Sequence, residues 1–175
     1  MEQKIITPIT KGVLLGLILI VVSLVIYFMK IEDSSIQWIP NGLLVIGVLI
    51  SVTQYGKQVA HNATFGDYFS HGFKVAALVT IIMIVYLLVF INVFPEFKDK
   101  ALEQARKQME AKKSLSPEKI DQALDITRKF FSLFAVLGIL IWDMILGAIG
   151  ALLGALITKK EPVTFHEEHY NQTTA

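Results

Sequence analysis

The side chain best suited to chemistry in this sequence is the carboxylate of Asp143, within the apolar run from Phe130 to Ile157. A charge at mid-bilayer depth costs about 2.5–3.5 kcal/mol on insertion scales, so such a residue is expected to face protein and not lipid. Three interpretations remain open. Asp143 binds a proton or a cation, it is hydrogen-bonded to a neighbouring helix or subunit, or it lies close to the membrane interface beside Trp142.

Polar residues of the other apolar segments are candidate partners for Asp143. Depth along a helix can be counted at 1.5 Å per residue from the polar end of each segment. The residues near the depth of Asp143 are Tyr27, Asn41, Tyr86 and Asn92. These four side chains are the first to consider as its hydrogen-bonding partners.

Small residues share one helical stripe with Asp143. At about 100° per residue, the stripe also contains Ser132, Val136, Gly147, Gly150 and Gly154. Glycines at four-residue spacing let helix backbones approach closely, which drives association in lipid. Gly12 and Gly16 form a similar pair, and Gly47 pairs with Ser51. We interpret these faces as packing inside a helix bundle, and an interface between subunits is the alternative.

A basic set flanks the aromatic segment "FGDYFSHGFK" before the third apolar run. Lys57, His61, His71 and Lys74 could together bind the phosphate of a lipid headgroup, or they could be solvated loop residues. The "HEEH" run at residues 166–169 lacks the HExxH spacing of a zinc site, so no metal site is expected there.

The remaining composition argues against several function classes. The chain has no cysteine, no Gly-rich phosphate loop and no Ser-His-Asp set, and Asp143 has no second intramembrane acid to work with. We therefore expect no catalysis and no cofactor. The formal net charge is +1, so nucleic-acid binding by bulk electrostatics is not expected either.

Four membrane-spanning helices would position these residues. Hydrophobic residues make up 54% of the chain and the mean hydropathy is +0.57. Because a span needs roughly 20 apolar residues, we predict helices over about 11–29, 38–55, 74–94 and 131–157. No cleavage site follows the first of them, so we expect a retained helix and not a signal peptide.

The segment of about 95–130 is the one that looks soluble. Residues 96–129 carry nine basic and seven acidic side chains. Leu102, Ala105 and Met109 form a narrow apolar stripe, and Ser116 followed by Pro117 is typical of a helix start. We predict an extramembrane helical hairpin, whose second arm could continue directly into the fourth span. Residues 159–175 form a polar tail.

The sequence thus predicts an all-α integral membrane four-helix bundle in a single domain, residues 1–175, with the hairpin between the third and fourth spans. A bare count of Lys and Arg would put the hairpin in the cytoplasm. However, Lys4 and Lys11 precede the first span and acidic Glu32 and Asp33 follow it, and the first helix usually dominates orientation. We therefore favour cytoplasmic termini.

Several motifs resemble those of the bacterial family called domain of unknown function 4199. They are "TFGDYFSHGFK" before a membrane helix, "FPEF" at the end of that helix, "LSPEKIDQAL" in the hairpin and a Gly-rich last helix followed by lysines. The resemblance implies a small integral protein of the bacterial inner (cytoplasmic) membrane with no assigned activity. It also suggests similarity to accessory proteins found beside polyprenyl-phosphate glycosyltransferases. Asp143 is not part of the resemblance.

The function that we expect is non-enzymatic. The protein would be an accessory or scaffold subunit in the lipid bilayer, packing through its Gly-rich faces and contacting a membrane-protein partner, or a second copy, with its charged hairpin. The alternative is a small transporter, channel or lipid-carrier translocation component, in which Asp143 binds a proton, a cation or a polar headgroup.

Overall fold

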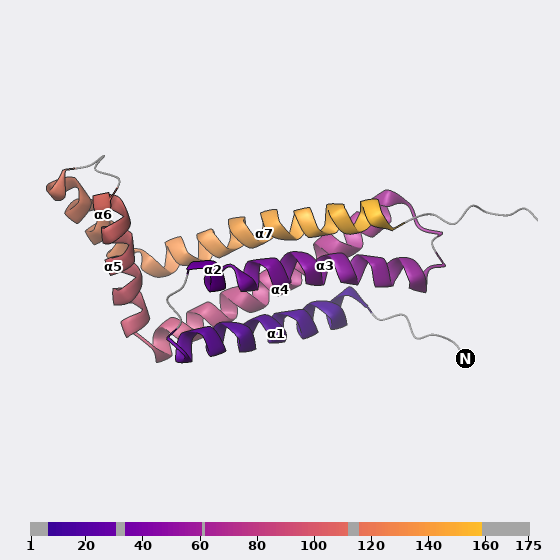
Figure 1. Ribbon diagram of the computed structural model, residues 1–175, viewed down its shortest axis with the longest axis horizontal. Coiled ribbons are helices and arrows are strands. Elements are labelled where there is room, and N and C mark those ends of the chain that lie inside the picture. The colour runs from indigo at the N-terminus through magenta and orange to yellow at the C-terminus, as the bar shows by residue number, and fades with distance from the viewer. Residues whose placement is uncertain (1–6, 31–33, 61, 112–115, 159–175) are drawn as a thin grey trace, which may run out of the picture.

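The computed structural model describes residues 7–30, 34–60, 62–111 and 116–158, and these residues form helices with no strand among them (Figure 1). The helices are α1 (Pro8–Phe28), α2 (Ser34–Gln37), α3 (Ile39–Gln58), α4 (Phe65–Val93), α5 (Glu96–Ala111), α6 (Pro117–Lys129) and α7 (Phe131–Ile157). The predicted tail 159–175, with its "HEEH" run, lies outside the described residues.

Four helices, α1, α3, α4 and α7, are long and apolar enough to cross a membrane. Their outward faces carry exposed large apolar side chains, such as Leu14, Val85 and Ile141. Apolar side chains exposed along the full length of a helix are expected where the solvent is lipid. The chain is therefore an all-helical, multi-pass membrane protein.

The long helices alternate in direction along the chain. α1 and α4 run towards the α5–α6 end of the molecule, and α3 and α7 run away from it, so the start of α1 and the end of α7 lie at the opposite end (Figure 1). α3 and α4 each pack against the other long helices, and α1 and α7 lie on opposite sides of them. The apolar core includes Leu19, Leu44, Val48 and Val79.

The glycines singled out in the sequence lie at the contacts between these helices. A Cβ added at Gly12 would meet Leu78 at 2.9 Å, one at Gly16 would meet Ile82 at 3.0 Å, and one at Gly47 would meet Leu15. On α7, a Cβ at Gly147 would meet Ala76, one at Gly150 would lie 2.7 Å from the Val45 oxygen, and one at Gly154 would lie 2.8 Å from Val52. The small residues therefore allow close approach inside the molecule.

Helix α4, the third of the four predicted spans, begins at Phe65, nine residues before the predicted start at residue 74. The cause is a capping box. Thr64 N–H donates to Asp67 Oδ2 at 2.9 Å, and Asp67 N–H donates to Thr64 Oγ1 at 3.3 Å. The aromatic segment "FGDYFSHGFK" thus forms the first turns of α4, and its Tyr68 is only 1% exposed.

Helices α5 and α6 form an antiparallel pair with a small core of their own. Leu102 of α5 packs against Ile120 and Leu124 of α6, and Ala105 and Met109 complete the cluster, as the apolar stripe predicted. Outside this core, Lys107 pairs with Glu103 at 2.8 Å, and this hydrogen bond and charge hold the pKa of Glu103 below its usual value. Glu96 makes no such i,i+4 pair and instead accepts from Tyr27.

The second arm of the hairpin does not continue into the last span. α6 ends at Lys129, and Phe130 (φ −111°, ψ 25°) turns the chain before α7 begins at Phe131. Phe131 packs against the hairpin core, and Lys98 Nζ lies 5.8 Å from the centre of its ring. These contacts hold the hairpin across the axis of the long helices (Figure 1), which a sequence without a helix breaker does not reveal.

Replacing Gly150 by Ala is expected to destabilise the protein, because the added methyl group would be forced against the carbonyl oxygen of Val45. Overpacking of this kind costs about 1–3 kcal/mol. Gly138 is the matched control on the same helix, since a Cβ there would meet nothing within 4 Å. Unfolding free energies in detergent should fall for Gly150→Ala and not for Gly138→Ala. Equal values for the two variants would contradict this packing.

Candidate functional site

Asp143 lies in the middle of α7 and is half-buried. Gly147 faces Ala76 and Gly72 faces Ala151, so α4 and α7 are antiparallel in a register that brings Thr80 to the level of Asp143. The Thr80 hydroxyl donates to the Ala76 oxygen of its own helix at 3.0 Å. Asp143 makes no hydrogen bond or ion pair with any residue that the structure describes.

The four candidate partners of Asp143 lie in different places. Asn41 contacts the residue next to Asp143, because its Oδ1 accepts from Nε1 of Trp142 at 3.1 Å. Tyr27 donates to Glu96 Oε1 at 3.2 Å, at the hairpin end. Asn92 is exposed and donates to the Leu88 oxygen of its own helix at 2.6 Å.

Tyr86, the fourth candidate, also lies at the hairpin end. Its ring centre is 5.4 Å from that of Phe90, which in turn lies 4.8 Å from the ring of Tyr27. Tyr27 and Tyr86 therefore both pack against Phe90, and neither is hydrogen-bonded to Asp143. The depth count failed for these residues because of the register between the helices. α4 begins at Phe65 and brings Thr80 to the level of Asp143, and Gly12 of α1 already faces Leu78 of α4.

A buried polar cluster occupies the opposite end of the molecule. Lys11 of α1 donates from Nζ to the Ser51 oxygen at 3.0 Å, and the same Nζ lies 3.5 Å from Nε2 of His71. Ser51 Oγ lies 3.4 Å from that Nε2, and the Tyr55 ring stacks on the imidazole with centres 4.1 Å apart. Lys11, Ser51 and His71 are 9%, 4% and 5% exposed. Three helices thus contribute to one polar site.

The basic set proposed for a lipid headgroup is divided in the structure. His71 points into the Lys11 cluster, whereas Lys57 and Lys74 are exposed, and His61 lies outside the described residues.

Sequence reasoning treated Lys11 only as a flanking charge. The signal that could have revealed the cluster is the Thr64-x-x-Asp67 capping box, because a helix that begins at residue 65 carries His71 inside the membrane-spanning part.

Two further polar atoms near this cluster are buried. Tyr68 Oη and Gln58 Oε1 have no hydrogen-bond partner among the described residues, and the Tyr68 ring centre lies 6.1 Å from that of Tyr55.

The Lys11–Ser51–His71 cluster is remote from Asp143. Nine residues of α4 separate His71 from Thr80, or about 14 Å along the helix axis, so the Lys11 ammonium does not neutralise the carboxylate.

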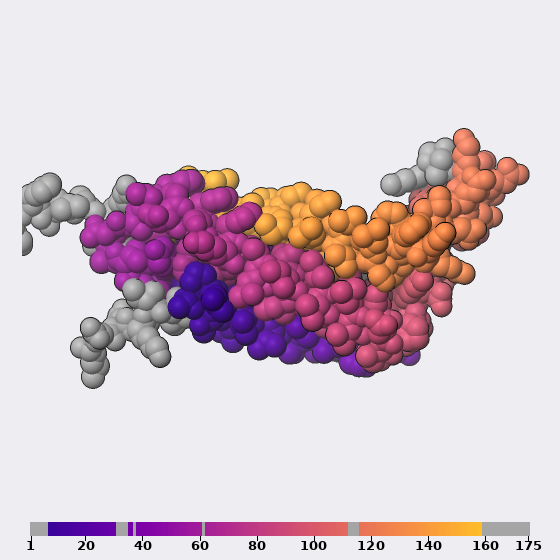
Figure 2. Space-filling model, turned by 180° about the vertical axis from the view of Figure 1, so that it is seen from behind, coloured from indigo at the N-terminus to yellow at the C-terminus, as the bar shows by residue number. Residues whose placement is uncertain are grey.

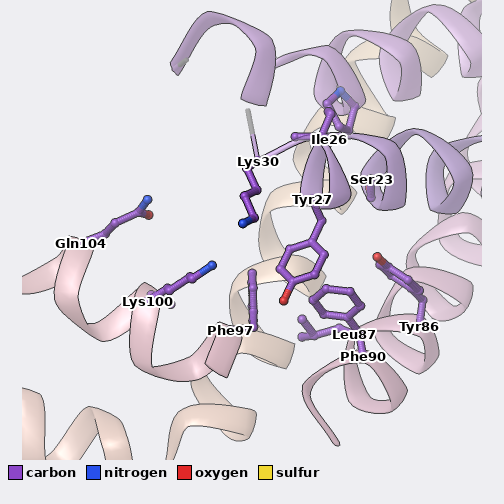
Figure 3. A pocket seen from close by; sticks show the side chains of 12 residues that line it. Ser23, Ile26, Tyr27, Lys30, Tyr86, Leu87, Phe90, Phe97, Lys100 and Gln104 are labelled. Carbon is purple, nitrogen blue, oxygen red and sulfur yellow. The ribbon is translucent and has the colours of Figure 1, made fainter. Parts of the chain in front are cut away.

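A pocket of about 450 Å³ lies at the hairpin end, between α1, α3, α4 and α5 (Figure 3). Its wall contains the aromatic side chains of Tyr27, Tyr86, Phe90 and Phe97, and Lys30 and Lys100 are at its edge. Within the described ranges no three His, Asp or Glu side chains are grouped closely enough to hold a metal ion. The chemistry that this arrangement offers is therefore binding through apolar surface and positive charge.

Four membrane-spanning helices with a charged helical pair at one end define a small multi-pass helical membrane protein. The chain belongs to the DUF4199 family, a family of proteins of unknown function, whose model matches residues 10–160. No curated protein and no solved structure shows a significant match.

Lys11 is expected to resist chemical modification in the folded protein, because its ammonium group is buried against Ser51 and His71. In purified protein treated with a water-soluble acetylating reagent, peptide mass spectrometry should show Lys11 modified several-fold more slowly than the exposed Lys57. Replacing His71 by Ala should accelerate modification of Lys11 and leave the rate at Lys57 unchanged. Equal rates at the two lysines in the unaltered protein would contradict the buried cluster.

Proposed function

We propose that this chain is a non-enzymatic accessory or scaffold subunit of the bacterial cytoplasmic membrane, with both termini on the cytoplasmic side. The spans anchor and pack the protein, and the extramembrane α5–α6 hairpin contacts a membrane-protein partner or a second copy of the chain. The family resemblance suggests a polyprenyl-phosphate glycosyltransferase as one partner to test.

The observation that carries this proposal is a groove of about 510 Å³ between α5 and α6. Six of its lining residues are charged, namely Asp99, Glu103, Arg106, Asp121, Asp125 and Arg128. Four acidic and two basic side chains give the groove a net charge of −2. A surface of this kind favours a partner segment that carries Lys or Arg side chains.

The groove is supported by contacts between the two arms of the hairpin. The Leu102–Ile120–Leu124 core joins the two arms, Arg106 pairs with Asp121 across them, and Arg128 lies 3.9 Å from Asp99. Figure 2 shows the hairpin projecting to one side at the end of the long helices. Because the hairpin has its own core and projects from the spans, it is available to a partner without disturbing the packing of α1, α3, α4 and α7.

Replacing Asp125 by Lys is expected to weaken the complex, because it changes the net charge of the groove from −2 to 0 and repels a basic partner segment. Recovery of the partner in a mild-detergent pull-down, quantified by mass spectrometry, should fall by roughly fivefold or more. Glu118→Lys is the matched control, since Glu118 is an exposed acid of α6 that does not line the groove. Equal recovery with the two variants would refute the groove as the contact surface.

A second candidate function is supported by one observation. Asp143 is half-buried in a spanning helix and has no hydrogen-bond partner among the described residues. Intramembrane carboxylates with this placement are typical of proton and cation pathways. On this hypothesis the protein is a small transporter, channel or lipid-carrier translocation component, and Asp143 binds the proton, cation or headgroup.

Asp143→Asn separates the two functions, because it keeps side-chain volume and removes the titratable group. If Asp143 carries ions, proton flux into proteoliposomes, followed with an internal pH dye, should fall to the level of empty liposomes, and Asp143→Glu should retain flux. Size-exclusion profiles should not change. Flux that is equal in Asp143→Asn and the unaltered protein, or absent from both, would exclude proton transport through Asp143 and leave the scaffold function in place.

A further inference from the structure

The pocket at the hairpin end exists because the start of α3 does not extend as far towards the hairpin as the ends of α1 and α4. Gly47 of α3 faces Leu15 of α1, and the two helices are antiparallel, so Ile39 at the start of α3 reaches only the level of Ser23. The last turns of α1 and α4 therefore lack α3 as a neighbour. Ser23 and Pro40 both line the pocket that results.

The wall of the pocket is apolar and largely aromatic. Leu87 and Phe90 of α4 are 9% and 6% exposed. The Phe90 ring lies 4.8 Å from that of Tyr27 and 5.3 Å from that of Phe97, both in edge-to-face contact. These rings join α1, α4 and α5 around one cavity, so the wall is held from three helices and offers a surface for hydrocarbon.

The edge of the pocket is positively charged. Figure 3 shows the ammonium groups of Lys30 and Lys100 directed at the same space beside Tyr27. Lys30 has φ of 51°, which turns the chain out of α1, and Lys100 Nζ lies 5.9 Å from the centre of the Tyr27 ring. Neither lysine forms an ion pair with a carboxylate in the described part of the chain.

Among the described residues, Glu96 carries an acidic group next to Tyr27 of the pocket wall. Glu96 accepts the hydrogen bond of the Tyr27 hydroxyl at 3.2 Å and does not line the pocket. The charged residues that line the pocket, Lys30 and Lys100, are both basic, and these two described lysines together with Glu96 carry a net charge of +1. An occupant that suits both the edge and the wall combines an anionic group with hydrocarbon.

We propose that this pocket binds the phosphate headgroup of an anionic membrane lipid, with Lys30 and Lys100 at the phosphate and the adjoining part of an acyl chain on the Phe90–Phe97 wall. The pocket lies at the ends of α1 and α4, where a spanning helix meets the headgroup layer. Lysine side chains near the ends of membrane helices extend to the interface, where lipid phosphates lie. Lysine, as a compact point charge, suits a phosphate oxygen.

The test measures lipid binding to the purified full-length protein by native mass spectrometry. Dioleoyl phosphatidylglycerol should bind about tenfold or more tightly than dioleoyl phosphatidylcholine. Lys30→Gln with Lys100→Gln should remove that preference. Lys119→Gln with Lys129→Gln, which removes two exposed hairpin charges away from the pocket, should retain it.

Two further arms distinguish a lipid from a free anion. Ala101→Phe, which fills the pocket from α5, should weaken binding of both lipids, and millimolar inorganic phosphate should not displace phosphatidylglycerol. The proposal is overturned if phosphatidylglycerol shows no preference, if the Lys30/Lys100 variant binds as the unaltered protein does, or if the control pair loses the preference equally. Displacement by inorganic phosphate would also overturn it, since the site would then be an anion site without a lipid.

Discussion

The close approach of α7 to α3 and α4 is the contact on which the rest of the structure depends. In lipid there is little hydrophobic drive for helices to associate, so packing of backbones through small residues supplies the attraction. The absence of side chains at Gly150 and Gly154 lets α7 touch the backbone of α3, at the Val45 and Leu49 oxygens. The same stripe seats Gly147 on Ala76 of α4. Once this register is set, the direction of α7 also fixes where the hairpin leaves the spans, because Phe131 at its start packs into the hairpin core.

Polar groups are distributed around this tight contact in a way that follows from their cost in an apolar medium. The Lys11–Ser51–His71 cluster lies at one end of the helices, and the Tyr27–Glu96 hydrogen bond lies at the other. Each end is close to the level at which water and headgroups can share in solvation. Asp143 is the exception, since it lies midway along α7 without a hydrogen-bond partner in the described ranges. This isolation is why it remains the residue on which a transport function would depend.

The sequence was sufficient to predict the features that depend on local pattern. Length and hydropathy predict the four long apolar helices, the 100° spacing predicts the glycine stripe, and the Leu102 stripe with Pro117 predicts that α5 and α6 pack together. Features that depend on which helices are neighbours could not be predicted. The contact between Lys11 and His71 joins α1 to α4 and requires their register, and the pocket requires knowing that α3 starts late. The missed capping box at Thr64 is a different kind of failure, because that signal is local and was present in the sequence.

Helix α5 connects the two surfaces proposed to bind other molecules. Phe97, Lys100, Ala101 and Gln104 recur at helical spacing on the face towards the pocket, while Asp99, Leu102, Glu103 and Arg106 recur on the face towards the groove. One helix therefore carries both faces. A lipid phosphate held between Lys30, which follows α1, and Lys100 of α5 would tie the hairpin to the spans and set the direction in which the groove points. Because binding linkage is reciprocal, a partner in the groove would then alter lipid affinity by the same factor by which the lipid alters the affinity for the partner.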